Sequence, residues 1–171
     1  MLLIFHEMSK EDMYRMVHSV YIEASYENAK EKYPESEDLT EAMKQEETYF
    51  VEKFLGKFMS KNENSYYVLE ENGVWVSALR LTKLDGYFYM EALETAPDYR
   101  KKGYAEKLIC EVIKQLGESA VIRSNVRKTN VASLATHKKC GFVIEQENGI
   151  NPLLEAKYDD KYGMLYENAG E

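Results

Sequence analysis

Two hairpin signals within one aromatic-rich stretch restrict the folds that this chain can adopt. Residues 66–96 are rich in aromatic and β-branched side chains, and they are interrupted at Asn72-Gly73 and at Asp85-Gly86. Both dipeptides favour the left-handed backbone of a tight hairpin turn. The stretch therefore predicts three antiparallel strands connected as a meander.

A helix and another strand follow the meander. Apolar residues recur at helical spacing from Ala105 to Leu116, and Gly117 marks the end of the helix. The sequence AVIRSNV (120–126) is then typical of a strand. This order predicts one strand-helix-strand crossover, and therefore an α/β chain with a mixed sheet.

The flanking segments are predicted to add three helices and three strands. Residues 2–8 suit a strand, Ser9 suits the cap of a helix that ends near Pro34, and Thr40 suits the cap of a second helix. The second helix carries a phenylalanine stripe that is expected to pack in the core. The stripe is formed by Phe50, Phe54 and Phe58; a short helix is predicted over 130–140 and strands over 142–147 and 162–167. The chain has no internal repeat or linker, so we expect a single domain spanning residues 1–171.

The composition limits the class of protein further. The 171 residues are 44% apolar and 30% charged, with a mean hydropathy of −0.54, which suits one soluble domain. No apolar run approaches the roughly 20 residues of a membrane span, and the opening MLLIF is too short for a signal peptide. We therefore expect a cytoplasmic protein without membrane association.

The cysteines and histidines do not predict a metal site. Cys110 and Cys140 lie in separate predicted elements, and their spacing is not that of metal ligands. Free thiols in a reducing compartment are expected rather than a disulfide. The three histidines are scattered along the chain.

The charge is unevenly distributed. A net charge of −8 argues against nucleic acid as a partner, because nucleic acid binds basic surfaces. Residues 100–139 nevertheless contain ten basic and three acidic residues. This region is either a set of solvated helix faces or a local anion site on an otherwise acidic protein.

The basic region begins with a loop that could bind an anion. Arg100, Lys101 and Lys102 precede Gly103 at the start of the crossover helix, and Ala105 keeps the first turn uncrowded. Glycine lets the main chain approach a ligand closely, and the first amides of a helix suit a phosphate. Alone, this short pattern does not distinguish an anion-binding loop from an ordinary turn.

Two sequence segments together carry a resemblance to a known family. PDYRKKGYAEKLI, followed about thirty residues later by NVASLATHKKCGF, resembles the GNAT superfamily of acyl-CoA-dependent N-acyltransferases. Its motifs are Arg/Gln-x-x-Gly-x-Gly/Ala and, in loose form, Asn-x-x-Ala-x-x-x-Tyr-x-x-x-Gly-Phe. The matches are Arg100, Gly103 and Ala105 in the first motif and Asn130, Gly141 and Phe142 in the second, with Ala132 or Ser133 near the small position.

The resemblance implies both a fold and a cofactor site. The fold would be a mixed, mostly antiparallel central sheet flanked by helices, whose one strand-helix-strand crossover carries the loop for the coenzyme A pyrophosphate. The strand before the loop would pair with the pantetheine arm of acetyl-CoA, and the short helix would contact the same cofactor. The residues so assigned are Leu93, Glu94, Thr95, Arg100, Lys101, Lys102, Gly103, Tyr104, Ala105, Asn130, Ser133 and His137.

Acetyl transfer from a thioester to an amine needs a neutral amine and a stabilised oxyanion. An alkylammonium has a pKa near ~10, so a base or an ordered water must remove its proton. Glu91 and Glu94 are the candidate bases, and their odd spacing predicts that they lie on opposite faces of the strand. Either could instead be a solvated or salt-bridged carboxylate. A main-chain amide near Leu93 or Glu94 could polarise the thioester carbonyl.

The departing thiolate needs a proton, and here the chain departs from the family pattern. His137 occupies the position usually held by a tyrosine, and an imidazole with a pKa near ~6.5 can protonate a thiolate. His137 could alternatively only bind the cofactor, and the tyrosines that could then supply the proton are Tyr158, Tyr162 and Tyr166.

The helix that carries His137 is predicted to have two faces. Its polar face holds Asn130, Ser133 and His137 and could look into the cofactor cleft. Asn130 could also be only the N-cap of this helix, a role that is compatible with a cofactor contact. The residues expected to pack inward are Val131, Leu134 and Ala135.

The expected function is direct transfer of an acetyl group from acetyl-CoA to a primary amine of a small molecule or peptide, without an acyl-cysteine. Residues 35–47 contain six acidic residues and one basic residue, so they form either an acceptor wall for a cationic amine or a hydrated helix face.

Two other classes of protein are alternatives to this function. A non-catalytic acyl-CoA-binding module is the main alternative, because the family's tyrosine is missing. An unrelated nucleotide-binding domain would be expected to carry Gly-x-x-x-x-Gly-Lys-Ser/Thr or Gly-x-Gly-x-x-Gly, which the chain lacks. A homodimer through exposed tyrosines or the last strands stays open.

Overall fold

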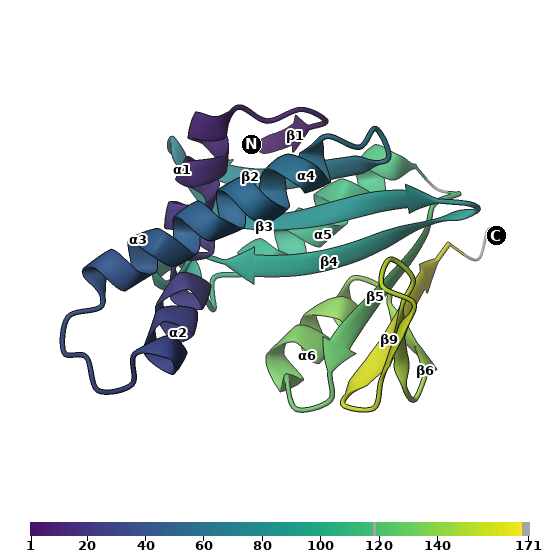
Figure 1. Cartoon of the computed structure of the whole chain (residues 1–171). Helices are drawn as coiled ribbons and strands as arrows, with labels where there is room; N and C mark the ends of the chain where they lie inside the picture. The colour runs from purple at the N-terminus through teal and green to yellow at the C-terminus, as the bar shows by residue number, and fades with distance from the viewer. Residues whose placement is uncertain (118, 169–171) are drawn as a thin grey trace.

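A seven-stranded sheet forms the centre of the molecule (Figure 1). The computed structural model describes residues 1–117 and 119–168. The strand order is β1-β2-β3-β4-β5-β9-β6, and among these described strands only β4 and β5 pair in parallel. The strands are β1 (Leu2–Phe5), β2 (Asn64–Glu71), β3 (Val74–Leu84), β4 (Tyr87–Thr95), β5 (Val121–Arg127), β6 (Val143–Gln146) and β9 (Lys161–Glu167). The predicted mixed, mostly antiparallel sheet is confirmed.

The predicted meander corresponds to β2, β3 and β4. Asn72 and Gly73 in the first turn have left-handed φ values of 51° and 79°, and Gly86 in the second has a φ of 78°. The predicted crossover is also present, because α5 (Tyr104–Leu116) connects β4 to the parallel strand β5.

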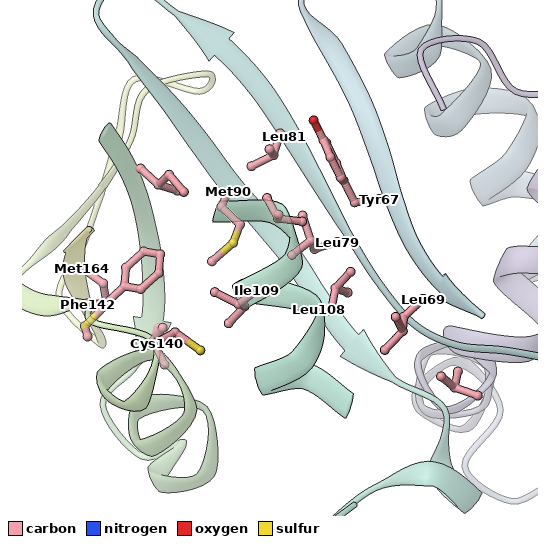
Figure 2. Packing of buried hydrophobic residues seen from close by; sticks show 14 residues of the cluster. Tyr67, Leu69, Leu79, Leu81, Met90, Leu108, Ile109, Cys140, Phe142 and Met164 are labelled. Carbon is pink, nitrogen blue, oxygen red and sulfur yellow. The ribbon is translucent and has the colours of Figure 1, made fainter. Parts of the chain in front are cut away.

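Helices cover both faces of the sheet and produce two apolar clusters. On one face, the cluster joins α1 (Lys10–Val20), the π-helix η1 (Phe50–Leu55) and α4 (Gly56–Met59) to the sheet. On the other face, Leu108 and Ile109 of α5 meet Leu79 and Met90, as Figure 2 shows. The remaining helices are α2 (Ile22–Lys32), α3 (Thr40–Tyr49), the 3-10 turn η2 (Pro97–Tyr99) and α6 (Val131–Lys139).

The first predicted helix starts and ends near the expected residues, but it is broken in the middle. The Ser9 hydroxyl accepts a hydrogen bond from the Asp12 amide at 3.0 Å, which confirms the cap. Helical structure continues to Lys32, near Pro34, but in two pieces, because Tyr21 leaves helical geometry at φ −102° and ψ 15° and separates α1 from α2.

The second predicted helix also differs from the expectation. Its cap is not Thr40: the Asp38 carboxylate accepts the Thr40 amide at 2.9 Å, and Leu39 holds the cap position. The helix widens into the π turn of η1. The phenylalanine rings stack, with centroids 5.1 Å and 6.1 Å apart, but Phe54 remains 36% exposed, so the stripe is only partly core.

A short hairpin and two neighbouring thiols complete the fold. The strands β7 (Gly149–Asn151) and β8 (Ala156–Tyr158) form a hairpin that was not predicted, because three residues are too few to show an alternating pattern. Cys110 and Cys140 are free thiols, as expected, although their sulfur atoms lie 3.7 Å apart.

Candidate active site

The two parallel strands part and leave a cavity between them. Pairing of β4 with β5 ends at Met90 and Ser124, and beyond these residues the strands diverge (Figure 1). A cavity of about 220 Å³ lies there, and we call it the interstrand cavity. It is lined by Met90, Glu91, Ala92, Leu93, Ser124, Asn125, Val126, Arg127, Asn130, Ser133, His137 and Lys161. A slot between strands can hold an extended ligand arm whose amides bond to the main chain.

A β-bulge in β4 lies at the edge of this cavity. Ala78 pairs with Glu94 and Arg80 pairs with Glu91, so one β3 residue faces two β4 residues, Ala92 and Leu93. Ala92 has a left-handed φ of 53°, which is uncommon for a residue with a Cβ. The bulge re-aims the main chain of β4 where the strand meets the cavity.

The bulge overturns the prediction that Glu91 and Glu94 lie on opposite faces of β4. Their partners Arg80 and Ala78 are two residues apart on β3 and therefore share a face. The extra residue in the bulge shifts the alternation by one position, so the two glutamates share a face as well.

The two glutamates nevertheless have different surroundings. Glu91 lines the interstrand cavity and accepts a hydrogen bond from the Arg80 guanidinium at 3.1 Å. Glu94 is outside the residues that line the cavity and pairs with Arg100 at 2.9 Å. Burial raises the pKa of Glu94, and the Arg100 guanidinium offsets part of that shift. Of the two candidate bases, the geometry places only Glu91 at the cavity.

The loop before α5 has the backbone conformation expected of an anion site. Gly103 holds the N-cap position of α5 with a left-handed φ of 81°, and no side chain in the described part of the chain caps the helix. A Cβ on Gly103 would meet no described atom within 4 Å. The first amides of α5 are therefore open to a ligand, and the end of the helix favours negative charge.

The three bases before Gly103 do not all project freely from the loop. Arg100 forms ion pairs with Glu23 of α2 and Glu94 of β4, and it donates to the Thr95 carbonyl at 3.1 Å. Lys102 donates to the Asp98 carbonyl at 2.8 Å. Arg100 therefore ties the loop to the end of β4, a role that the sequence motif did not reveal.

The aromatic residue that follows Gly103 has a packing role. The ring of Tyr104 lies 5.9 Å from the ring of Tyr99, centroid to centroid, in a T-shaped arrangement. In the same loop, Lys101 has a left-handed φ of 59°, and the φ of Gly103 is left-handed as well. These two residues adopt a backbone conformation that exposes successive amides.

The polar face of α6 points into the interstrand cavity. Asn130 caps the helix by accepting the Ser133 amide at 3.0 Å, and Asn130, Ser133 and His137 all line the cavity. The opposite face differs from the prediction. Leu134 packs against the core, but Val131 and Ala135 are exposed, because the short helix meets the core along a narrow strip only.

His137 is buried, and its hydrogen bond defines its tautomer. Its Nδ1 lies 2.8 Å from the Ser133 carbonyl oxygen. A carbonyl oxygen only accepts, so Nδ1 carries the proton and Nε2 presents a lone pair. Burial lowers the pKa of His137, which favours this neutral form. In that form His137 accepts a hydrogen bond, and only its protonated form could act as an acid.

The three tyrosines considered as alternative acids lie elsewhere. Tyr158, in the β7–β8 hairpin, accepts from Asn151 at 3.2 Å. Tyr166 packs on Phe142 with ring centroids 5.6 Å apart, and Tyr162 packs against the same core cluster. Among the residues that the structure describes, none of the three lines the interstrand cavity.

The structure brings to the site two residues that the sequence analysis did not select. Tyr21 donates a hydrogen bond from its hydroxyl to the carbonyl of Ala92 in the bulge, at 2.6 Å. Asn125 of β5 donates from one amide group to the Tyr89 hydroxyl and to the Ile150 carbonyl, both at 2.8 Å. Neither lies in a motif, so no sequence signal could have identified them.

The acidic segment 35–47 is only partly free. Glu46 binds Lys32, and Glu47 lies 3.2 Å from His18. Glu35, Glu37 and Asp38 line a separate hollow between α2 and α3.

In residues 1–117 and 119–168, no cluster of three or more potential metal ligands is found. None of the described helices is long and apolar enough to span a membrane.

The fold combines a mixed sheet, whose two parallel strands diverge, with a crossover helix that begins after Gly103. This is the architecture implied by the family that the two sequence motifs resemble. The chain belongs to the acetyltransferase (GNAT) family, and the family's model matches residues 16–142. No match was found among curated proteins.

Solved structures share the fold at low sequence identity. The PaiA N-acetyltransferase from Thermoplasma acidophilum in complex with coenzyme A is 15% identical, covers 98% of this chain and 99% of its own, and has a TM-score of 0.64. The ribosomal-protein-S18-alanine N-acetyltransferase from Escherichia coli is 16% identical, with coverages of 100% and 96% and a TM-score of 0.60. A chimera of the spermidine N-acetyltransferase SpeG from Vibrio cholerae and hSSAT is 19% identical, with coverages of 98% and 96% and a TM-score of 0.60.

Proposed function

We propose that the chain transfers an acetyl group from acetyl-CoA directly to a primary amine of a small molecule or peptide. The observation that carries the proposal is the interstrand cavity, which opens where β4 and β5 part and is lined by the polar face of α6. The loop 100–105 would hold the pyrophosphate through its amides, and the cavity would hold the pantetheine arm. Membership of the acetyltransferase family supports this choice of cofactor.

Two residues that line the cavity, Glu91 and His137, would have different roles in acetyl transfer. Glu91 would take a proton from the ammonium group, directly or through a water molecule. The neutral amine nitrogen would then bond to the thioester carbon, and the carbon–sulfur bond would break. The ammonium group loses two protons in all: Glu91 passes the first to solvent, and the second, released from the nitrogen as the amide forms, ends on the thiolate. His137 would bind the cofactor as a hydrogen-bond acceptor, because its neutral form offers only the Nε2 lone pair.

Calorimetric titration with acetyl-CoA, with ATP and NAD as controls, tests the cofactor. Selective binding of acetyl-CoA is expected, and equal or tighter binding of ATP or NAD would contradict the proposal. A panel of small amines and basic peptides, with thiol release as the readout, then tests transfer. Selective binding without thiol release from any amine would instead favour a non-catalytic acyl-CoA-binding module.

A further inference from the structure

Tyr21 connects the helical layer to the bulge in β4. It lies between α1 and α2, 71 positions before Ala92, and its hydroxyl donates to the Ala92 carbonyl at 2.6 Å. The side chain is buried, and its ring lies 6.5 Å from the rings of Phe50 and Tyr66, centroid to centroid. The ring therefore packs in the core, while the hydroxyl group bonds to the bulge.

The peptide unit between Ala92 and Leu93 is the part of the bulge that Tyr21 controls. No cis peptide bond occurs among the described residues, so the carbonyl of Ala92 and the N–H of Leu93 point in opposite directions. The carbonyl points to Tyr21 in the layer of α1 and α2. The N–H therefore points to the other face, where Leu93 packs with the α5 cluster and where α6 lines the interstrand cavity.

This peptide unit needs to be held, because its conformation is not one that the chain prefers. A left-handed φ of 53° at Ala92 brings the Cβ close to the following carbonyl. Without a partner for the Ala92 carbonyl, the peptide could rotate toward a regular strand geometry. Such a rotation would turn the Leu93 amide away from the cavity.

We propose that Tyr21 is a positioning residue, whose hydroxyl fixes the Ala92–Leu93 peptide so that the Leu93 amide donates to the thioester carbonyl of the bound acyl donor. The inference rests on the proposed function. As the amine attacks, the carbonyl oxygen gains negative charge, which the amide stabilises, and the charge leaves again when the carbon–sulfur bond breaks. Tyr21 itself contacts neither the cofactor nor the amine.

The same cluster contains a matched control. Tyr66 is fully buried beside Tyr21, and its hydroxyl, which interacts with the Tyr21 hydroxyl and with Arg80, makes no hydrogen bond to the bulge among the described residues. The substitutions Tyr21→Phe and Tyr66→Phe each remove one buried hydroxyl and keep the ring. Only the first removes a bond to the bulge.

The test uses acetyl-CoA labelled with carbon-13 at the thioester carbonyl. A hydrogen bond from Leu93 moves this carbonyl resonance downfield when wild-type protein binds. We expect Tyr21→Phe to lose most of that shift and to lower kcat about tenfold, less than the roughly 10²–10³-fold that removal of an oxyanion donor costs, because the Leu93 amide is misplaced and not removed; the Kd of free coenzyme A should be unchanged within about twofold. Tyr66→Phe should keep both the shift and kcat.

The outcomes separate this inference from the proposed function. A full downfield shift and wild-type kcat in Tyr21→Phe would overturn the role of Tyr21. An equal loss in Tyr66→Phe would overturn it as well, because the effect would then not belong to the one hydroxyl that bonds to the bulge. Failure of the wild-type protein to bind acetyl-CoA would overturn the proposed function itself. The carbon-13 measurement needs no acceptor amine, so it can be made before the acceptor is known.

Discussion

At the scale of single residues, His137 shows how a histidine can satisfy a helix and still face a cavity. Its Nδ1–H group donates to the Ser133 carbonyl one turn earlier, and its ring makes a T-shaped contact with Phe142 at 5.1 Å between centroids. Both contacts hold the ring against the core. The side chain also lines the interstrand cavity, and burial lowers the pKa of His137, which favours the neutral form.

This burial predicts how stability depends on pH. The folded pKa of His137 lies below its unfolded value, so the unfolded chain takes up a proton first as the pH falls. The stability due to neutral His137 should be complete above pH ~6.5 and decline as the pH falls toward the folded pKa, by at most about 1.4 kcal/mol per pH unit. Urea unfolding between about pH 5 and 8 measures this decline.

Two histidine variants make that measurement specific. His137→Gln should have a shallower decline than wild type at acid pH, because it removes the titrating group. His6 is exposed, so His6→Gln controls for the loss of an imidazole as such. An acid decline of the same steepness in His137→Gln and in wild type would contradict the prediction.

Local contacts were predictable from the sequence, and distant contacts were not. The caps Ser9 and Asn130 bond to amides three residues away, so residue type and position suffice to predict them. The Thr40 cap failed because the helix begins one residue earlier than expected: Leu39 holds the cap position, and Thr40 is already helical, with its own amide bonded to the Asp38 carboxylate. The bond from Tyr21 to Ala92 joins segments that only the folded sheet brings together.

At the scale of elements, an interruption of regular secondary structure, the bulge in β4, lies at the candidate site. The prediction for Glu91 and Glu94 assumed a regular strand, and one extra residue in the bulge reversed it. The break at Tyr21 and the π turn of η1 are likewise departures from regular helices. Periodicity predicts the type of an element well, but it carries little information about an insertion of one residue.

The loop before α5 yields a prediction at this scale. Gly103→Ala should weaken acetyl-CoA binding about tenfold or more, because a Cβ would project into the open space beside the first amides of the helix. The left-handed φ adds a folding cost of about 1 kcal/mol. Calorimetry gives the affinity, and urea unfolding gives the cost.

Gly86 offers a matched control for the strain. Its φ of 78° is close to the 81° of Gly103, and a Cβ there would also meet no described atom within 4 Å. Gly86→Ala should therefore lose similar stability while keeping wild-type affinity. Equal affinities in the two variants would argue against a phosphate role for the loop.

At the scale of the whole molecule, one sheet is shared by two apolar clusters. Alternate residues of β2 and β3 contribute to opposite clusters: Tyr66 and Ala78 face the α1 side, whereas Tyr67 and Leu79 face α5. The meander and crossover were predictable from turn residues and periodicity. The insertion of β9 between β5 and β6 was not, because pairing between strands far apart in sequence leaves no local pattern.

This shared sheet predicts that the chain unfolds as one unit. Leu55 and Leu108 are both fully buried, one in each cluster, so Leu55→Ala and Leu108→Ala create comparable cavities on opposite faces. Each should cost about 2–5 kcal/mol. Because β2 and β3 belong to both clusters, each variant should lower the same single transition, seen alike by far-UV circular dichroism and by fluorescence of Trp75. Two separate transitions, or a loss confined to one probe, would show that residues 1–171 contain more than one folding unit.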